Sequence, residues 1–283
     1  MKGDLKALLE GKLLPIELAS LCKSYDIIGD IAVIRIPETL SSHNNIIAEA
    51  LMQQHKHVKS VWRQASPVSG VFRLRDLEWI AGEKQTTTLY KEHGCLFKVD
   101  IKECYFSPRL AYERMRIANA VRNKEVIVNM FAGVGAYSII IARHSTAAKI
   151  YSIDLNPVAV EHLRENILLN KMINRVIPME GEASSIIHQK LQNIADRVLM
   201  PLPEKAYEYI ESALSAINQQ SGWIHYYDFE HARKHEDPID KVKAKVSHTL
   251  QRRKIKFELA HNRVVRQTGP NWYQIAVDIH VTK

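Results

Sequence analysis

Cysteine is scarce in this 283-residue chain, which contains only Cys22, Cys95 and Cys104 and no C-x-x-C pair. This spacing argues against a zinc site and a disulfide framework, and it is typical of a reducing compartment. The thirteen histidines include no H-E-x-x-H motif. The sequence therefore predicts no metal site.

Long hydrophobic runs are also lacking, because charged residues interrupt every apolar segment. A membrane-spanning helix needs about 20 predominantly apolar residues, so none is expected. The N-terminal sequence MKGDLKALLEGK has neither a continuous apolar stretch nor a small-residue cleavage site, so no secretion signal is expected. These features predict a cytoplasmic protein that does not contact a membrane.

Acidic residues are in the minority: 31 Asp and Glu are opposed by 39 Lys and Arg, for a net charge of +8. The excess is concentrated between Lys241 and Arg266, where nine basic residues accompany a single acid, Glu258. One interpretation is a solvated helix face. The other is a surface that binds the phosphates of a nucleic acid.

Residues 125–157 contain the strand, glycine turn and helix that are typical of a nucleoside-cofactor domain. An apolar strand leads into Gly133 and Gly135, and a second strand ends at Asp154. Glycines let the backbone approach a ligand closely, and a carboxylate at the end of the next strand can bind ribose hydroxyls. Gly135 and Asp154 are nineteen residues apart, near the spacing expected for an adenosine ribose.

The identity of the cofactor depends on the third position of the glycine motif. A dinucleotide fingerprint reads G-x-G-x-x-G, and here the third position is Ser138. The remaining pattern, F-x-G-x-G followed by D-x-N-P, suits a nucleoside without phosphates, for which S-adenosylmethionine is the usual ligand. An ordinary strand–helix turn is the alternative for the glycine pair taken alone.

The order of the elements predicts a helical segment at 1–23, a small α+β domain at 24–104 and an α/β domain at 105–283. In the small domain we expect strands on both sides of Gly29-Asp30 and at 60–63, 72–79, 87–93 and 95–100, and a helix at 43–56. In the α/β domain we expect strands at 126–130, 149–154, 175–180, 195–200 and 222–229, helices at 137–142, 158–169, 204–217 and 239–254, and a hairpin at 256–264 and 272–281. Serial strand–helix units that end in a hairpin indicate a doubly wound sheet with an antiparallel edge.

Upstream of the glycine turn, Ser107 and Pro108 are suited to the N-cap and first position of a helix. On that helix Arg109 and Glu113 would share one face, with Arg116 three residues further on. Taken alone, this pattern is an exposed ion pair that contributes less than about 1 kcal/mol.

The ordered set of motifs, however, resembles the archaeal and eukaryotic tRNA (guanine-37-N1)-methyltransferases and the related wybutosine-pathway transferases. The matching segments are YDIIGDIA (25–32), FRLRDL (72–77), AGE (81–83), YFSPRLAYER (105–114), MFAGVG (130–135), IDLNP (153–157), DRVLM (196–200) and IHYY (224–227). The resemblance implies a class I, Rossmann-like methyltransferase domain that uses S-adenosylmethionine, preceded by a small domain that contacts RNA. It also implies a monomer that acts on the tRNA anticodon loop.

The resemblance assigns roles to individual residues. Guanine N1 carries a proton that a carboxylate must remove, and a guanidinium can stabilise the charge that develops on O6. The family pattern makes Glu113 the base, Arg109 its partner at the base oxygen, and Arg73 a neighbour of the target nucleotide. The implied cofactor-binding residues are Tyr105, Arg114, Phe131, Gly133, Gly135, Asp154, Leu155, Glu182, Ala183 and Pro201.

Three positions depart from the family pattern. Asn129 replaces an Asp, Glu182 replaces the Asp of Gly-Asp-Ala, and Pro201 replaces the Asn of Asn-Leu-Pro. An Asn side chain offers a donor and an acceptor to a base, whereas Pro offers neither. We therefore expect a pocket reshaped for two bases. Because the family includes archaeal enzymes that also methylate the wyosine precursor, the resemblance then implies C7 methylation of 4-demethylwyosine in wyosine biosynthesis. Tolerated drift in a working enzyme is the alternative for Pro201.

Two other functions remain open at this point. The first is an aminocarboxypropyltransferase of the wybutosine pathway that uses the same cofactor, although Glu113 favours methylation because guanine N1 needs a base. The second is a non-catalytic tRNA-binding relative, suggested by the departures at Asn129, Glu182 and Pro201.

Overall fold

The computed structural model describes residues 5–22 and 24–283 and divides into two compact units, one ending at Arg109 and the other beginning at Leu110. Each unit has its own sheet and its own hydrophobic core. The predicted division into 1–23, 24–104 and 105–283 stays a prediction, and residues 1–4 and 23 lie outside the described residues.

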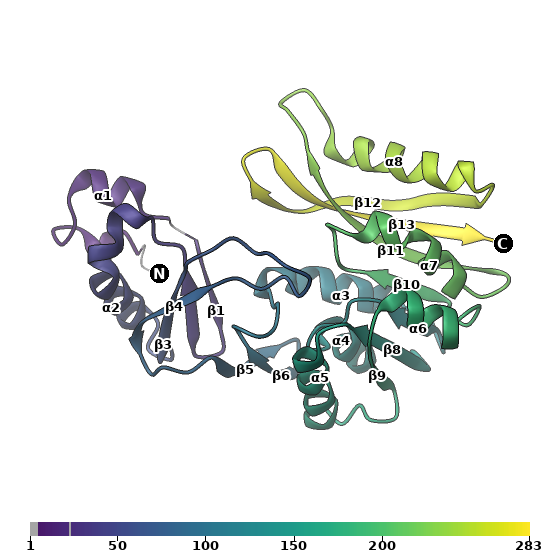
Figure 1. Ribbon diagram of the computed structural model, residues 1–283, viewed down its shortest axis with the longest axis horizontal. Coiled ribbons are helices and arrows are strands. Elements are labelled where there is room, and N and C mark those ends of the chain that lie inside the picture. Colours follow the sequence, from purple (N-terminus) through teal and green to yellow (C-terminus); the bar gives the residue numbers. More distant parts are fainter. Residues whose placement is uncertain (1–4, 23) are drawn as a thin grey trace. The chain divides into compact units, whose positions relative to one another are not determined.

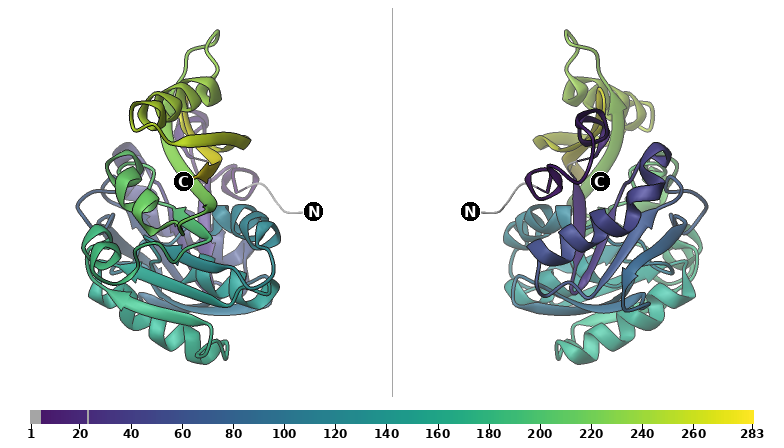
Figure 2. Two further views of the ribbon diagram at one scale, coloured as in Figure 1. Left: turned by 90° about the vertical axis from the view of Figure 1, so that its right-hand side faces the viewer. Right: turned by 90° about the vertical axis from the view of Figure 1, so that its left-hand side faces the viewer.

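A four-stranded sheet with the order β1-β2-β3-β4 forms the centre of the first unit (Figure 1). Its strands are β1 (Tyr25–Ile28), β2 (Ile31–Ile34), β3 (Ser60–Gln64) and β4 (Leu77–Gly82). Helix α2 (Asn44–Gln54) connects the parallel strands β2 and β3 and lies against one face of the sheet (Figure 2). Its buried residues share one core with the sheet. Short helical elements complete this unit: 3-10 turns at Ala7–Leu9 and Glu38–His43, and α1 (Pro15–Ser20).

The strand predicted at 72–79 is wrong in its first half, since β4 begins only at Leu77. The preceding residues form a turn in which the Arg73 amide donates to the Gly70 carbonyl at 3.2 Å. Arg73 has a φ of +57°, in the left-handed region, which ends any extended run there. The hairpin of β5 (Thr87–Glu92) and β6 (Cys95–Asp100) follows as predicted.

The second unit contains a seven-stranded sheet with the order β12-β13-β11-β10-β7-β8-β9. Strands β11, β10, β7, β8 and β9 are parallel, while β13 runs antiparallel to its neighbours β11 and β12. The strands are β7 (Val126–Asn129), β8 (Lys149–Asp154), β9 (Val176–Glu180), β10 (Arg197–Met200), β11 (Ser221–His231), β12 (Lys256–Gly269) and β13 (Trp272–Thr282). This is the predicted doubly wound sheet with an antiparallel hairpin at one edge.

Helices flank both faces of this sheet (Figures 1 and 2). They are α3 (Ala111–Ala120), α4 (Ala136–His144), α5 (Pro157–Leu169), α6 (Ala183–Lys190), α7 (Ile210–Ala216) and α8 (Pro238–Arg252), with a 3-10 turn at Ala206–Tyr209 before α7. Buried residues of α6, α7 and α8 share a core with β7, β10, β11 and β13. No sequence signal predicted α6. No helix in the described ranges is long and apolar enough to cross a membrane.

The predicted helix start at Ser107 and Pro108 is wrong in detail. Pro108–Leu110 is a 3-10 turn, and the α-helix begins at Ala111 with Leu110 as its N-cap residue. Arg109 therefore lies outside α3, and the helical spacing that was expected to bring it onto one face with Glu113 does not apply. The tighter turn winds the chain differently from an α-helix before α3 begins.

Candidate active site in the methyltransferase-like unit

The glycine turn follows β7 and leads into α4. Gly133 and Gly135 have φ angles of +55° and +92°, and Gly135 is the N-cap residue of α4. The Gly133 amide donates to Asp154 Oδ2 at 2.6 Å, so the turn is tied to the end of the neighbouring strand β8. The structure thus brings Gly133, Gly135 and Asp154 together, as expected for a cofactor site at the carboxyl ends of parallel strands.

Asp154 is held by backbone amides on both oxygens. Its Oδ1 accepts from the Asn156 amide at 2.9 Å, and Asn156 in turn caps α5 by accepting from the Val158 amide at 3.0 Å. Burial raises the pKa of Asp154, while the amides of Asn156 and Gly133 act in the opposite direction. The next residue, Leu155, is 44% exposed. A fixed carboxylate beside an exposed apolar side chain fits a ribose and its base.

Gly135 is required for packing as well as for its backbone angle. A Cβ atom added there would lie 2.4 Å from Leu163 Cδ1 in α5 and 3.2 Å from Ile139 Cδ1. The glycine therefore allows α4 and α5 to approach each other beside the turn.

A buried polar cluster lies directly beneath the turn. Asn129, at the end of β7, donates through Nδ2 to Ser138 Oγ at 3.1 Å, and Ser152 Oγ lies 2.7 Å from the same oxygen. All three side chains are fully buried. Ser138 occupies the position of the third glycine in a dinucleotide fingerprint. Where that motif has no side chain, this protein has a buried hydroxyl that accepts a hydrogen bond from Asn129.

Glu182 is the N-cap residue of α6. Its carboxylate accepts from the Ser184 amide at 2.9 Å and from the Ser185 amide at 2.7 Å, which satisfies two free donors of the helix. Tyr209 also hydrogen-bonds to Glu182, and burial together with this contact raises the pKa of Tyr209 to about 12. The Tyr209 ring meets Phe131 edge to face, with centroids 5.0 Å apart. Ala183, next in the chain, is buried.

Pro201 follows β10 and is half-buried. The Leu202 amide donates to the Met200 carbonyl at 2.8 Å, which turns the chain sharply at Pro201. The Leu202 carbonyl then accepts from Ala206 at 2.9 Å, at the start of the 3-10 turn. The proline thus presents neither an amide donor nor a polar side chain at the end of this strand.

Glu113 lies in the first turn of α3 and is only 1% exposed. Its Oε1 accepts from Arg116 Nη2 and from the Tyr227 hydroxyl, each at 2.7 Å. Its Oε2 accepts from Arg116 Nε at 3.0 Å and from Arg263 Nη1 at 3.2 Å. A buried carboxylate is stable only where such donors compensate its charge. Burial, followed by the charges of Tyr137 and Glu113, raises the pKa of the Tyr227 hydroxyl well above its ordinary value, so it donates to Glu113 as a neutral group.

The partners of Glu113 belong to a network of buried polar side chains. Arg116 donates through Nη1 to Asp278 Oδ2 at 2.5 Å, and Asp278 Oδ1 lies 2.6 Å from His225 Nδ1. His225 Nε2 lies 2.5 Å from Arg197 Nη1, and Arg197 also donates to Glu125 Oε2 at 2.7 Å. This hydrogen-bond network therefore extends from α3 across the sheet to the start of β7.

His225 is neutral in this network, and its two hydrogen-bond partners determine its tautomer. A guanidinium can only donate, so Nε2 must accept from Arg197 and the ring proton must lie on Nδ1, facing Asp278. Burial lowers the pKa of His225, and the nearby carboxylate of Asp278 opposes this without overcoming it. For Asp278, burial acts to raise the pKa, but His225 and Arg116 hold it well below its usual range.

No sequence pattern assigned a role to Tyr227, His225, Arg197 or Asp278. Two of them were visible as an anomaly, since Arg197 and His225 fall in strands that otherwise read as buried and apolar. Charged or polar side chains in such strands need buried partners. That signal indicates a network but does not identify its members.

The remaining predicted residues occur in both units. In the second unit, the Arg114 guanidinium carbon lies 6.0 Å from the centre of the Tyr137 ring, and Arg114 is 3% exposed. In the first unit, the Arg73 guanidinium carbon lies 4.2 Å from the centre of the Tyr105 ring. Arg109 donates through Nε to Asp26 at 2.7 Å. The roles predicted for these residues stay predictions.

Fewer cations of the basic segment between Lys241 and Arg266 are free to bind phosphates than its charge suggests. Ion pairs engage five of its cations: Lys241 with Glu230 and Glu236, Lys243 with Asp240, Lys245 with Asp228, Arg253 with Glu211, and Arg263 with Glu113. Arg266 donates to Gln274. Arg252, Lys254 and Lys256 are exposed and form no ion pair with any residue that the structure describes. Within the same residues, no group of His, Cys, Asp and Glu side chains could hold a metal ion.

Comparison with known families matches both parts of the chain. A family described as the TRM5/TYW2 methyltransferase domain matches residues 88–256, and one described as the TYW2 N-terminal domain matches residues 5–86.

Several archaeal proteins are similar along most of the chain. The tRNA (guanine(37)-N(1))-methyltransferase Trm5b of Pyrococcus abyssi is 40% identical over 92% of this chain and 75% of its own length. The tRNA 4-demethylwyosine(37)-methyltransferase Taw21 of Saccharolobus solfataricus is 36% identical over 91% of this chain and 93% of its own length. The tRNA (guanine(37)-N(1))/4-demethylwyosine(37)-methyltransferase Taw22 of Nanoarchaeum equitans is 30% identical over 91% of this chain and 99% of its own length.

Solved structures give the same relationship. The crystal structure of Trm5b from Pyrococcus abyssi has a TM-score of 0.85 and 40% identity, covering 96% of this chain and 79% of that one. The complex of aTrm5 with tRNALeu has a TM-score of 0.84 and 34% identity, covering 100% and 79%. The structure of TYW2 from Methanocaldococcus jannaschii with AdoMet has a TM-score of 0.67 and 26% identity, covering 92% and 100%. The sheet, the glycine turn and these matches together place the chain in the TRM5/TYW2 family of methyltransferases that use S-adenosylmethionine.

Proposed function

We propose that the protein transfers the methyl group of S-adenosylmethionine to N1 of guanosine 37 in the anticodon loop of tRNA. The observation that carries this proposal is the buried Glu113 carboxylate, held by Arg116, Arg263 and Tyr227 in the unit that contains the glycine turn. Tyr137, in the first turn of α4 after Gly135, lies with its ring 6.4 Å from that of Tyr227, which connects the carboxylate to the turn. The activities named for the similar archaeal proteins support the same assignment.

The residues at the turn fit the cofactor. Asp154 would bind the ribose hydroxyls, and the backbone at Gly133 would border the methionine part. Phe131 and Tyr209 would provide an aromatic wall, and Glu182 would lie near the adenine. When bound, S-adenosylmethionine supplies an electrophilic methyl group, and positioning accounts for most of the rate of a direct displacement.

Glu113 would act as the general base. Guanine N1 becomes nucleophilic only when its proton leaves, and a carboxylate within hydrogen-bond reach can accept that proton. Oε2 suits this step better than Oε1, because its contacts with Arg116 Nε, at 3.0 Å, and Arg263 Nη1, at 3.2 Å, are longer than the two 2.7 Å bonds at Oε1. Arg116 and Tyr227 would hold the carboxylate in place while Arg263 gives way to the base. Arg109 would stabilise the charge on O6, and Arg73 would lie near the nucleotide.

The test is a reaction of the full chain with a tRNA transcript that carries G37 and with labelled S-adenosylmethionine, read by nucleoside mass spectrometry. We expect 1-methylguanosine from the wild type and a loss of at least about 100-fold in Glu113→Gln, since general base catalysis contributes about 10²–10⁴-fold. Glu161→Gln, an exposed carboxylate on α5, is the matched control and should keep the wild-type rate. Wild-type activity in Glu113→Gln would remove Glu113 from the mechanism.

We infer a second reaction from Pro201, namely C7 methylation of 4-demethylwyosine at the same tRNA position. Pro201 offers no hydrogen bond to a base edge, which suits a site that accepts two different bases, and the names of Taw21 and Taw22 support it. Pro201→Asn should restrict the enzyme to plain guanosine. An equal fall in both activities would contradict this inference.

Aminocarboxypropyl transfer is the competing function, because a Methanocaldococcus jannaschii tRNA(Phe) (4-demethylwyosine(37)-C(7)) aminocarboxypropyltransferase is 31% identical over 77% of this chain and 84% of its own length. The by-products separate the two reactions: methyl transfer leaves S-adenosylhomocysteine, whereas aminocarboxypropyl transfer leaves methylthioadenosine. A non-catalytic tRNA-binding relative would give no heat on titration with S-adenosylmethionine. The expectation of a cytoplasmic monomer stays a prediction, and light scattering measures the oligomeric state.

A further inference from the structure

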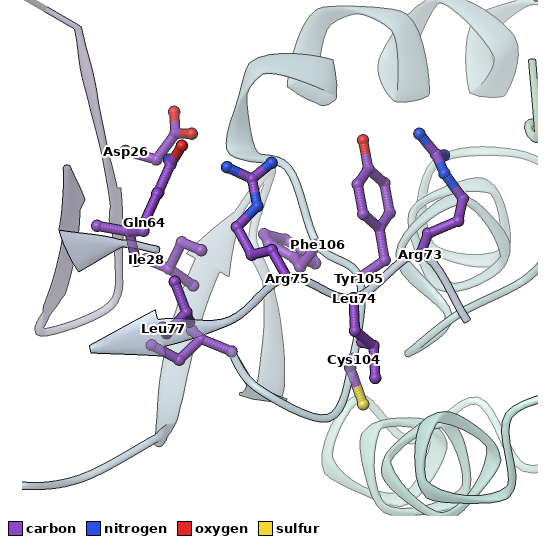
Figure 3. Close-up of a pocket in the computed structure, with 12 residues that line it drawn as sticks. Asp26, Ile28, Gln64, Arg73, Leu74, Arg75, Leu77, Cys104, Tyr105 and Phe106 are labelled. Atoms are coloured by element: carbon purple, nitrogen blue, oxygen red, sulfur yellow. The ribbon is translucent and has the colours of Figure 1, made fainter. Parts of the chain in front are cut away.

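The first unit contains a pocket lined by two arginines, Arg73 and Arg75, of which Arg75 has no role in the mechanism above. It has a volume of about 60 Å³ and lies among β1, β2, β3 and the segments around Arg75 and Tyr105 (Figure 3). Arg75 points into it and is half-buried. Across residues 5–22 and 24–283, Arg75 forms neither a hydrogen bond nor an ion pair. A guanidinium removed from water without a partner destabilises the fold, so its position needs an explanation.

The surroundings of Arg75 are cationic. Asp26 is the single acidic residue in the lining, and Arg109 already donates to it at 2.7 Å. Arg73 lies over the Tyr105 ring on the other side. In Figure 3 the polar ends of Arg75, Tyr105 and Arg73 point to the same side. Burial lowers the pKa of Arg75. The charges of Tyr105 and Asp26 oppose this without overcoming it, and those of Arg109 and Arg73 add to it, although the guanidinium stays protonated. A bound anion would offset the repulsion between Arg75 and the neighbouring guanidinium groups of Arg73 and Arg109.

The backbone holds this arrangement in place. Ser69 and Leu74 pair across the turn, with the Ser69 amide donating to the Leu74 carbonyl at 2.8 Å. On the other side of Arg75, the Asp76 amide donates to Ser66 Oγ at 2.8 Å and the Asp76 carbonyl accepts from the Ala65 amide at 2.9 Å. The backbone on both sides of Arg75 is therefore fixed before any ligand arrives, which lowers the entropy cost of binding.

We propose that this pocket binds a backbone phosphate of the RNA substrate, with Arg75 as its principal ligand. A phosphodiester carries one negative charge and two free oxygens, which match the planar fork of a guanidinium. Tyr105 adds an aromatic ring beside the cations, the combination that single-stranded nucleic acids bind. The choice of tRNA as the RNA rests on the proposed function, whereas the anion site itself depends only on the pocket.

The experiment compares three full-length variants in tRNA binding at several salt concentrations. Arg75→Gln removes the charge, Arg75→Lys keeps the charge but loses the fork, and Lys56→Gln removes an exposed charge beyond the end of α2, outside the pocket lining. For Arg75→Gln we expect a roughly tenfold loss of affinity and a salt slope smaller by about one, since each phosphate contact releases about one counterion. Arg75→Lys should keep the slope with weaker binding, and Lys56→Gln should match the wild type.

Thermal unfolding separates this role from a structural one. Removing an unpaired, half-buried charge should leave the melting temperature of Arg75→Gln unchanged or raise it. Unchanged tRNA binding together with a lower melting temperature would overturn the proposal. Titration with inorganic phosphate gives a second such outcome. If Arg75→Gln bound tRNA like the wild type but no longer gave heat with phosphate, the pocket would be a site for free phosphate and the proposal would also be overturned. Failure of the wild type to methylate tRNA would refute the proposed function instead and leave the binding comparison intact.

Discussion

Asn129 donates through Nδ2 to Ser138 Oγ at 3.1 Å, beneath the glycine turn and out of contact with solvent. This one bond relates two departures that look separate in the sequence, the Asn in place of the family's Asp and the Ser in place of a third glycine. An amide can donate to the serine oxygen, whereas a carboxylate at position 129 would be a buried charge that could only accept. The two residues are best understood as one unit.

Ser138→Ala should therefore destabilise the protein. The substitution leaves the buried Asn129 amide without its acceptor, which costs about 1–3 kcal/mol in the free energy of unfolding. Urea denaturation measures this. Ser152→Ala is the control and should cost less, because the Asn129–Ser138 bond survives. Equal stability of Ser138→Ala and the wild type would show that the bond contributes nothing.

Gly135→Ala should be far more damaging than Gly94→Ala. Both glycines have positive φ angles, +92° and +73°, so both substitutions strain the backbone by about 1 kcal/mol or more. Only at Gly135 would the new Cβ atom also meet a neighbour, Leu163 Cδ1, at 2.4 Å. We expect an additional loss of about 1–3 kcal/mol from this overlap, measured by thermal unfolding. Similar losses at the two sites would contradict the packing argument.

His225 should make the protein less stable as the pH falls below about 6.5. Its pKa is lowered in the folded state, so the unfolded chain takes up the proton first. Its neutral form is fully compatible with folding above pH 6.5, and stability is lost between that pH and the folded pKa, by at most about 1.4 kcal/mol per pH unit. His225→Gln keeps a donor and an acceptor but does not titrate, so its unfolding free energy should depend less on pH.

The comparison is the difference in unfolding free energy between wild type and variant, measured from pH 7.5 to pH 5.5. Contributions common to both proteins cancel in this difference. His57→Gln, at an exposed position, should follow the wild type. A constant difference across the range for His225→Gln would mean that His225 is not the neutral group that its contacts with Arg197 and Asp278 indicate.

In the basic segment, tRNA binding should depend on the three exposed cations without ion pairs. Replacing Arg252, Lys254 and Lys256 together by Gln should weaken binding and reduce the salt slope by about two or three, if each contacts a phosphate. Arg253→Gln should change the slope less, because Glu211 already engages that guanidinium. Fluorescence anisotropy with labelled tRNA at several salt concentrations measures both. An unchanged slope in the triple variant would indicate a solvated face.

Local sequence signals were sufficient for most of the second unit. The alternation of apolar strands and helices, the Asn156-Pro157 cap and the glycine turn each depend on neighbouring residues, and all appear in the structure. The signals failed where they were weak. Helix α6 is eight residues long and begins at Ala183, after Glu182, a residue type that is not a typical N-cap. The left-handed turn at Arg73 has no glycine at that position to indicate it.

The sequence by itself determined the sheet, the cofactor turn and the type of cofactor, because spacing and local backbone preference encode them. It could also mark Glu113 as a carboxylate of interest. Only the tertiary structure decided which groups surround that carboxylate, since Tyr227, Arg263 and the Arg116–Asp278 pair come from strands and helices far apart along the chain. A buried charge is stable only when distant elements bring its partners together, and no local pattern specifies that meeting.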